Sequence, residues 1–236
     1  MPTIKLLTFD LDDTLWEMKP VLIEAERRVY RWLEQHCPAI TRQMSLRELA
    51  MLRWEMAKEL SHLHHQISEL RITTMASVLK QNGIDTEEAR DLAEQAFTVF
   101  IDARHEIELF EYAEASLAQL AEHYTLGALT NGNADVFRLP IGQHFSFAFT
   151  AEQLNASKPA ADHFEQAQRH SGNPGAQRSI HIGDDPVKDI DAAAKLGWHT
   201  IWVNKEEKEW EGERQPTRTI NCLSQLAEAV QAIEAP

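Results

Sequence analysis

Residues 4–14 read Ile4-Lys5-Leu6-Leu7-Thr8-Phe9-Asp10-Leu11-Asp12-Asp13-Thr14, an apolar run that passes directly into acidic residues. A strand buried in a parallel sheet ends at the edge where ligands bind. Because side chains i and i+2 of extended backbone point to the same side, Asp10 and Asp12 can converge on one small volume. At about 4 Å and an effective dielectric near 20, their charges repel by roughly 4 kcal/mol, which favours a shared proton or a bound cation. The alternative is a helix N-cap or a turn built from Asp12 to Thr14.

The composition is that of a globular protein with a sizeable core. The chain has 236 residues, of which 43% are hydrophobic, and this size fits one larger domain carrying an insertion. A formal net charge of −14 predicts that neither nucleic acid nor an anionic membrane is a partner. Cys37 and Cys222 have no metal-ligand spacing, and the first strand follows Met1 too closely for a signal peptide. We therefore expect a cytoplasmic protein with free thiols.

Residues 17–107 carry helical rather than strand periodicity, which predicts an inserted α-helical bundle. We expect helices over residues 20–36, over 46–63 after a capping box formed by Ser45 and Glu48, over 67–83, and over 85–101. The three histidines at positions 62, 64 and 65 are interpreted as a solvated helix surface rather than a metal site.

From Phe110 onward helices and strands alternate. Strands are expected over 125–129, 145–149, 179–182 and 198–203, and helices over 113–123, 162–170, 186–196 and 223–233. This order predicts an α/β fold with a doubly wound, Rossmann-like parallel sheet, interrupted after its first strand. Residues 1–16 and 108–236 would form this core, and residues 17–107 the inserted domain. The charged segment 205–214 is expected to be a solvated loop.

Chemically active side chains recur where these strands end. Asp10 and Asp12 are followed along the chain by three further groups of such residues: Thr130 with Asn131, then Lys158, then Asp184 and Asp185 with Asp189. Acids hold a hard divalent ion, a hydroxyl and an amide hold anionic oxygens, and a lysine offsets charge, so a phosphate monoester fits the set. Taken singly, each group has a simpler interpretation as a turn, a loop before proline, or a helix N-terminus.

The order and spacing of these residues resemble the four motifs of the haloacid dehalogenase-like hydrolase superfamily. The matching segments are Asp10-Leu11-Asp12-Asp13-Thr14, Thr130-Asn131, Lys158-Pro159 and Gly183-Asp184-Asp185 with Asp189. The resemblance covers nearly the whole chain, and the helical insertion is similar to the helical cap of one subgroup. Among its members, the chain looks most like the bacterial phosphatases of phosphoribitylaminouracil and flavin mononucleotide (FMN).

The resemblance implies a mechanism. Asp10 would attack phosphorus and form an aspartyl-phosphate, while Asp12 would protonate the leaving alkoxide and then deprotonate the attacking water. Mg²⁺ would be held by the carboxylate of Asp10, the backbone carbonyl of Asp12 and Asp184, with support from Asp185 or Asp189.

Further positions follow from the same resemblance. Thr130 and the backbone of Asn131 would bind phosphoryl oxygens, and Lys158 would neutralise the nucleophile and the phosphate. Arg71 resembles a recurrent cap arginine and is a possible substrate contact. The partner would be a small phosphorylated metabolite, and the protein a monomer or weak homodimer.

Several functions stay open at this point. The first expectation is a Mg²⁺-dependent phosphatase that acts on phosphoribitylaminouracil or FMN in flavin metabolism. The alternatives are a nucleotide or sugar phosphatase, a sugar phosphomutase, a haloacid dehalogenase, and a phosphometabolite-binding protein without catalysis. Asp12 argues against the dehalogenase, because a leaving halide needs no proton donor.

Overall fold

The computed structural model describes residues 3–235, which divide into two compact units. One unit, here called the sheet unit, comprises the residues up to Glu17 and those from Glu108 onward. The other, here called the helical unit, comprises residues 18–107. In the described part of the chain no helix is both long and apolar enough to cross a membrane.

The sheet unit is built on a six-stranded parallel sheet with the order β3-β2-β1-β4-β5-β6. Its strands are β1 (Leu6–Phe9), β2 (Thr125–Thr130), β3 (Phe147–Thr150), β4 (Ser179–Gly183), β5 (His199–Val203) and β6 (Arg218–Ile220). The first strand lies in the interior of the sheet, between β2 and β4, and its side chains are fully buried. Residues that leave β1 therefore emerge between the ends of its two neighbours.

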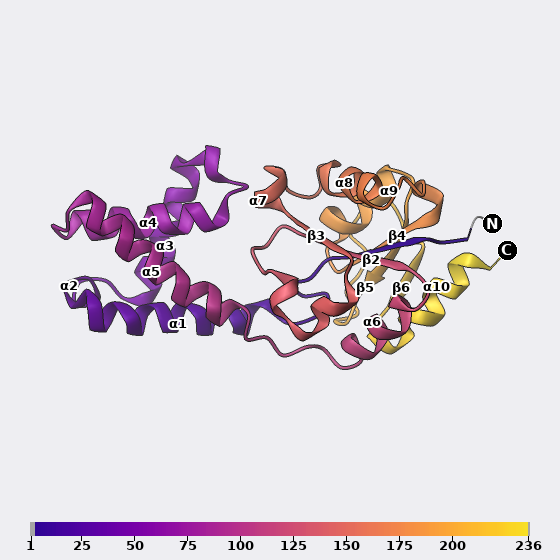
Figure 1. Cartoon of the computed structure of the whole chain (residues 1–236), viewed down its shortest axis with the longest axis horizontal. Helices are drawn as coiled ribbons and strands as arrows, with labels where there is room; N and C mark the ends of the chain where they lie inside the picture. Colours follow the sequence, from indigo (N-terminus) through magenta and orange to yellow (C-terminus); the bar gives the residue numbers. More distant parts are fainter. Residues whose placement is uncertain (1–2, 236) are drawn as a thin grey trace. The chain divides into compact units, whose positions relative to one another are not determined.

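Helices cover both faces of this sheet (Figure 1). They are α6 (Ala113–Ala121), α7 (Ala151–Leu154), α8 (Asp162–His170), α9 (Ala192–Lys195) and α10 (Leu226–Glu234). On one face Phe164 of α8 and Ala193 of α9 pack with Leu6 of β1 in a single apolar cluster. On the other face α6 lies beside α10, and Ser116 of α6 donates a hydrogen bond to the carbonyl of Leu223. The predicted doubly wound α/β fold is confirmed.

The helical unit contains α1 (Met18–His36), α2 (Pro38–Thr41), α3 (Leu46–Glu59), α4 (Ile67–Gln81) and α5 (Thr86–Arg104). The predicted capping box is formed: the Ser45 hydroxyl accepts from the Glu48 N–H, and the Glu48 carboxylate accepts from the Ser45 N–H. After α4 the chain turns at Gly83, whose φ of 86° is costly for residues with a Cβ. The apolar sides of α1, α4 and α5 form the core of this unit.

The structure adds the short helices α2 and α7, which we did not predict, and departs from the predicted elements in three further places. The chain after residue 205 adds the edge strand β6, which we did not predict. The helix expected over 186–196 begins as a π-helix at Pro186–Asp191 and becomes α-helical only from Ala192. The helix after Ser45 ends at Glu59, because a separate 3₁₀ turn occupies Ser61–Leu63.

Candidate active site

A buried lysine connects the end of β1 to the loop that carries the last acidic motif. The Lys158 ammonium donates to Asp10 Oδ1 over 2.7 Å and to Asp189 Oδ1 over 2.6 Å. The exposed fraction is only 3% for Lys158, 8% for Asp10 and 1% for Asp189. Hydrogen bonds between charged groups are stronger where water is excluded, so this arrangement fixes the lysine on both carboxylates.

Asp189 is held from several sides. Besides Lys158, its carboxylate meets His181 Nε2 at 3.1 Å and accepts from the backbone N–H of Asp185 over 3.0 Å. The π-helical turn brings it against β4 at Gly183, where a Cβ would overlap the Asp189 carboxyl carbon. A glycine at the end of β4 is therefore needed for Asp189 to approach the sheet.

Asp184 lies beside these two acids. Its Oδ1 accepts from the Thr14 hydroxyl over 3.1 Å, and its backbone carbonyl accepts from the Trp202 indole N–H over 2.8 Å. Burial, followed by repulsion from Asp189, raises the pKa of Asp184 to about 7. A group at this value is poised to change charge near neutral pH.

Asp10, Asp184 and Asp189 together form what we call the acid cluster. Each offers a carboxylate oxygen, and the three oxygens lie within 4.8 Å of one another. One lysine cannot compensate three carboxylates, and hard oxygen donors at this spacing suit Mg²⁺. The residues present therefore fit a divalent cation.

Asp10 and Asp189 both contact Lys158, but their pKa values shift in opposite directions. Burial, and then repulsion from Asp189 and Asp184, raises the pKa of Asp10 well above its usual value despite the contact with Lys158. Burial works in the same direction on Asp189, yet Lys158 and His181 lower its pKa below the usual value. Asp189 is thus the permanent anion of the pair, and Asp10 is the carboxylate that a cation would help to ionise.

The side chain of Asp12 lies outside the acid cluster. Its Oδ1 accepts from the Trp16 indole N–H over 2.9 Å, and it is partly exposed. The turn that follows needs a left-handed residue, because Asp13 has a φ of 60° and its N–H donates to the carbonyl of Trp16. The side chain of Asp12 is therefore oriented separately from that of Asp10.

Thr130 and Asn131 lie at the end of β2, and their side chains organise the local backbone. The Thr130 hydroxyl accepts from the N–H of Gly132 over 2.9 Å. The Asn131 amide donates to the carbonyl of Lys158 over 2.9 Å, and its oxygen accepts from the Lys158 N–H over 2.8 Å. The paired hydrogen bonds of Asn131 fix the segment from which the lysine projects, a contact that the sequence pattern did not predict.

Asp185 caps the turn that follows it. Its carboxylate accepts from the backbone N–H groups of Val187 and Lys188 and forms an ion pair with the Lys188 ammonium. Its side chain thus stabilises the π-helix that carries Asp189, and the three carboxylates brought together do not include it.

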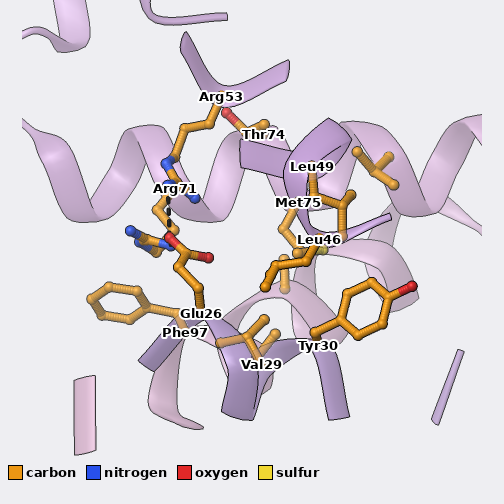
Figure 2. A pocket seen from close by; sticks show the side chains of 13 residues that line it. Glu26, Val29, Tyr30, Leu46, Leu49, Arg53, Arg71, Thr74, Met75 and Phe97 are labelled. Carbon is orange, nitrogen blue, oxygen red and sulfur yellow. Dashed lines mark hydrogen bonds and ion pairs between the residues drawn. The ribbon is translucent and has the colours of Figure 1, made fainter. Parts of the chain in front are cut away.

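Arg71 lies in the helical unit, beside a small cavity between its helices (Figure 2). Its guanidinium donates to Glu26 Oε1 over 2.8 Å and stacks on the Phe100 ring, while Arg53 contacts the same oxygen over 2.6 Å. Burial lowers the pKa of Arg71 to about 10. The cavity measures about 30 Å³, which holds about two water molecules and no metabolite. To contact a substrate, Arg71 would have to exchange its partner Glu26.

Comparison with known proteins gives the class of this protein. Residues 4–197 match the model of the haloacid dehalogenase-like hydrolase family. The chain belongs to this family and is an enzyme of it, which confirms the family predicted from the sequence motifs.

Two of the similar proteins are named for different activities, one for a phosphatase and one for a dehalogenase. The chain is 29% identical over 231 residues to the 5-amino-6-(5-phospho-D-ribitylamino)uracil phosphatase YigB of Escherichia coli, covering 96% of each chain. It is 39% identical to a structure named as a 2-haloacid dehalogenase from Pseudomonas syringae pv. Tomato DC3000, with a TM-score of 0.92 and 99% and 100% of the two chains covered. The HAD-hydrolase YfnB of Bacillus subtilis, solved with magnesium, shares the fold at 19% identity and a TM-score of 0.68, covering 97% of this chain and 99% of that chain.

The sequence motifs did not single out two residues that contact Asp189 directly or through one hydrogen bond. His181 lies two residues before Gly183 on β4, and Thr8 lies two residues before Asp10 on β1. Polar residues inside otherwise apolar strands were the available signal, since an unpartnered polar group in a buried strand is costly.

Proposed function

We propose that this enzyme is a Mg²⁺-dependent phosphatase that hydrolyses phosphate monoesters of small metabolites through an aspartyl-phosphate. The observation that carries the proposal is the buried Asp10 carboxylate, which is paired with the Lys158 ammonium inside the acid cluster. The YigB relative, a named phosphatase of nearly equal length, supports the same chemistry.

In the first chemical step, an Asp10 oxygen forms a bond to phosphorus as the bond between phosphorus and the ester oxygen breaks. Asp12 gives its proton to the departing alkoxide. In the second step Asp12 takes a proton from water, the water oxygen bonds to phosphorus, and the bond to Asp10 breaks to release phosphate. Lys158 offsets the negative charge on the nucleophile and on the phosphoryl oxygens throughout.

A divalent cation bound by Asp10, Asp184 and the backbone carbonyl of Asp12 would neutralise phosphoryl charge and keep Asp10 ionised. Thr130 and the backbone of Asn131 would donate hydrogen bonds to the phosphoryl oxygens. Asp189 acts by holding Lys158.

The substrate proposal is finer. We propose phosphoribitylaminouracil, the substrate in the name of the YigB relative, as the first substrate to examine. FMN, which rests on the resemblance of the sequence motifs alone, is the second. We also propose that the helical unit is a cap that selects the leaving group, and that the enzyme is a cytoplasmic monomer or weak homodimer.

A second candidate is hydrolysis of 2-haloacids, favoured by the 39% identity to the structure named as such a dehalogenase. Asp10 would then attack carbon and expel a halide. Two features count against this chemistry: a halide requires no proton from Asp12, and the acid cluster is suited to a cation that carbon chemistry does not need.

One set of assays separates these functions. Purified enzyme is given a panel of phosphorylated metabolites, including phosphoribitylaminouracil, FMN, nucleotides and sugar phosphates, and in parallel 2-chloropropionate, each with and without Mg²⁺. We expect Mg²⁺-dependent phosphate release and no chloride release. Chloride release with no phosphatase activity would reject the proposal, and conversion of one sugar phosphate to its isomer would favour a mutase.

Asp12 has its own test. We expect Asp12→Asn to reduce kcat for an alkyl phosphate by 10²- to 10⁴-fold, the usual worth of general acid–base catalysis. The reduction should be smaller for single-turnover cleavage of 4-nitrophenyl phosphate, whose leaving group departs without a proton. Asp162→Asn, the same change on α8, is the matched control. If Asp12→Asn slowed cleavage of the alkyl phosphate and of 4-nitrophenyl phosphate by the same factor, Asp12 would not be the proton donor.

A further inference from the structure

We propose that Thr8 and His181 are positioning residues that hold Asp189, and through it the Lys158 ammonium, in place against Asp10. The inference rests on the proposed function, since it assigns these two buried side chains a part in that reaction. Neither residue offers an oxygen to the acid cluster, so their effect on the nucleophile is transmitted by hydrogen bonds.

Thr8 and His181 face each other across neighbouring strands. They are paired in the register of β1 and β4, and the Thr8 hydroxyl lies 2.9 Å from His181 Nδ1. Both residues have no exposed surface. The ring of Phe164 packs edge to face on the imidazole at a centroid distance of 5.0 Å, which restricts rotation of the ring.

The other ring nitrogen contacts the acid that holds the lysine. His181 Nε2 lies 3.1 Å from Asp189 Oδ1, the same oxygen that accepts from Lys158 over 2.6 Å. Lys158 in turn donates to Asp10 over 2.7 Å. A continuous series of contacts therefore runs from Thr8 through His181, Asp189 and Lys158 to the nucleophile.

The charge of Asp189 assigns a direction to each hydrogen bond. An ionised Asp189 can only accept, so Nε2 carries a proton and donates it. With the proton of a neutral ring on Nε2, Nδ1 has a free lone pair and accepts from the Thr8 hydroxyl, which lies 2.9 Å away. Thr8 thereby selects the one neutral form of the ring that can donate to Asp189, in the way that outer hydrogen-bond partners orient ligating side chains.

The test uses three variants of the whole enzyme with an aryl phosphate and saturating Mg²⁺. Thr8→Val removes the hydroxyl at constant shape, His181→Leu removes the donor, and His181→Gln restores an N–H close to the position of Nε2. Thr200→Val is the matched control, because Thr200 is equally buried on β5 and is paired in register with His181 from the other side. We expect kcat to fall 10- to 100-fold in His181→Leu and at least threefold in Thr8→Val, with KM within twofold of wild type.

If His181 only filled space, a side-chain N–H at position 181 would not restore activity. Because we assign it the role of a donor to Asp189, we expect kcat of His181→Gln to be at least tenfold higher than that of His181→Leu. Ring ¹⁵N NMR of the metal-free protein supplies a readout that does not depend on turnover. Wild type should show a protonated Nε2 and an unprotonated Nδ1 for His181, and Thr8→Val should shift the Nδ1 signal while Thr200→Val leaves it unchanged.

The proposal is overturned if Thr8→Val and His181→Leu keep kcat within twofold of the control, if glutamine is no better than leucine, or if the ring proton resides on Nδ1. Should His181→Leu fail to fold, Thr8→Val and His181→Gln compared with Thr200→Val still decide the question. Unchanged phosphatase activity in Asp10→Asn would reject the proposed function instead. The NMR measurement needs no turnover, so it tests the hydrogen bonds of His181 whichever reaction the enzyme catalyses.

Discussion

Replacing Lys158 with methionine should destabilise the metal-free protein far more than an ordinary lysine substitution. The change keeps most of the side-chain volume and removes a charge that lies 2.7 Å from Asp10 and 2.6 Å from Asp189. At an effective dielectric of 20, each contact is worth roughly 6 kcal/mol of attraction before the cost of burial is subtracted. Removing one partner of a buried ion pair typically costs about 3–5 kcal/mol, so we expect a loss in this range for Lys158→Met.

The assay is urea unfolding in chelator-treated buffer, followed by circular dichroism and read as the free energy of unfolding. Lys195→Met is the control, since Lys195 lies in the same unit but forms a solvent-exposed pair with Glu213 that is worth at most about 1 kcal/mol. Adding Asp189→Asn to Lys158→Met should recover about 1–3 kcal/mol, because it removes a carboxylate left without its cation.

The reasoning is refuted if Lys158→Met loses no more stability than Lys195→Met, or if the second substitution adds its own loss instead of recovering stability. Either result would mean that the buried carboxylates do not depend on the lysine for their compensation.

Three further predictions concern other parts of the molecule. The pKa of Asp184 is raised to about 7 in the folded state, so between about pH 4 and 7 the folded metal-free protein keeps a proton that the unfolded chain has already lost. The free energy of unfolding should therefore decrease by about 1.4 kcal/mol per pH unit over that window as the pH rises. Asp184→Asn should remove this part of the pH profile measured by urea unfolding. Asn131→Ala should lower the free energy of unfolding by about 1–3 kcal/mol and reduce kcat, since it leaves the backbone N–H and C=O of Lys158 without partners. Unchanged urea unfolding and unchanged kinetics would show that the hydrogen bonds of Asn131 do not hold this segment. Glu26→Gln should destabilise the helical unit by about 1–3 kcal/mol, because two arginines lose their shared anion, and hydrogen exchange of α1 and α4 should report faster opening if this is correct.

The sequence predicted the parts of the fold in which local pattern and tertiary environment agree. The apolar residues 125–129 form a buried strand next to β1, and the Ser45–Glu48 box begins a helix where it was expected. Both signals are local, and packing in the folded protein reinforces them.

Where packing overrides local pattern, prediction failed. The strand β6 has three residues, two of them exposed, and exists because β5 offers a free edge to pair with. The π-helix Pro186–Asp191 accompanies the close approach of Asp189 to Gly183, a contact that no helical periodicity encodes.

The same distinction applies to the site. The residue types and their order indicated which strand ends would matter, because parallel strands end at one edge. The sequence could not say that the Asn131 side chain would hold the backbone of Lys158, or that Arg71 would be paired with Glu26. Such contacts depend on rotamers and on distances across the fold, which spacing along the chain does not determine.

The two connections between the sheet unit and the helical unit start from adjacent backbone. Trp16 and Leu109 form an isolated β-bridge, and the N–H of Phe110 donates to the carbonyl of Leu15 over 2.8 Å. Residues 18–107 are thus inserted between two segments that pair with each other and belong to the sheet unit. Residues 18–107 could therefore be replaced by a short glycine linker or by a foreign domain without breaking any strand pairing of the parallel sheet.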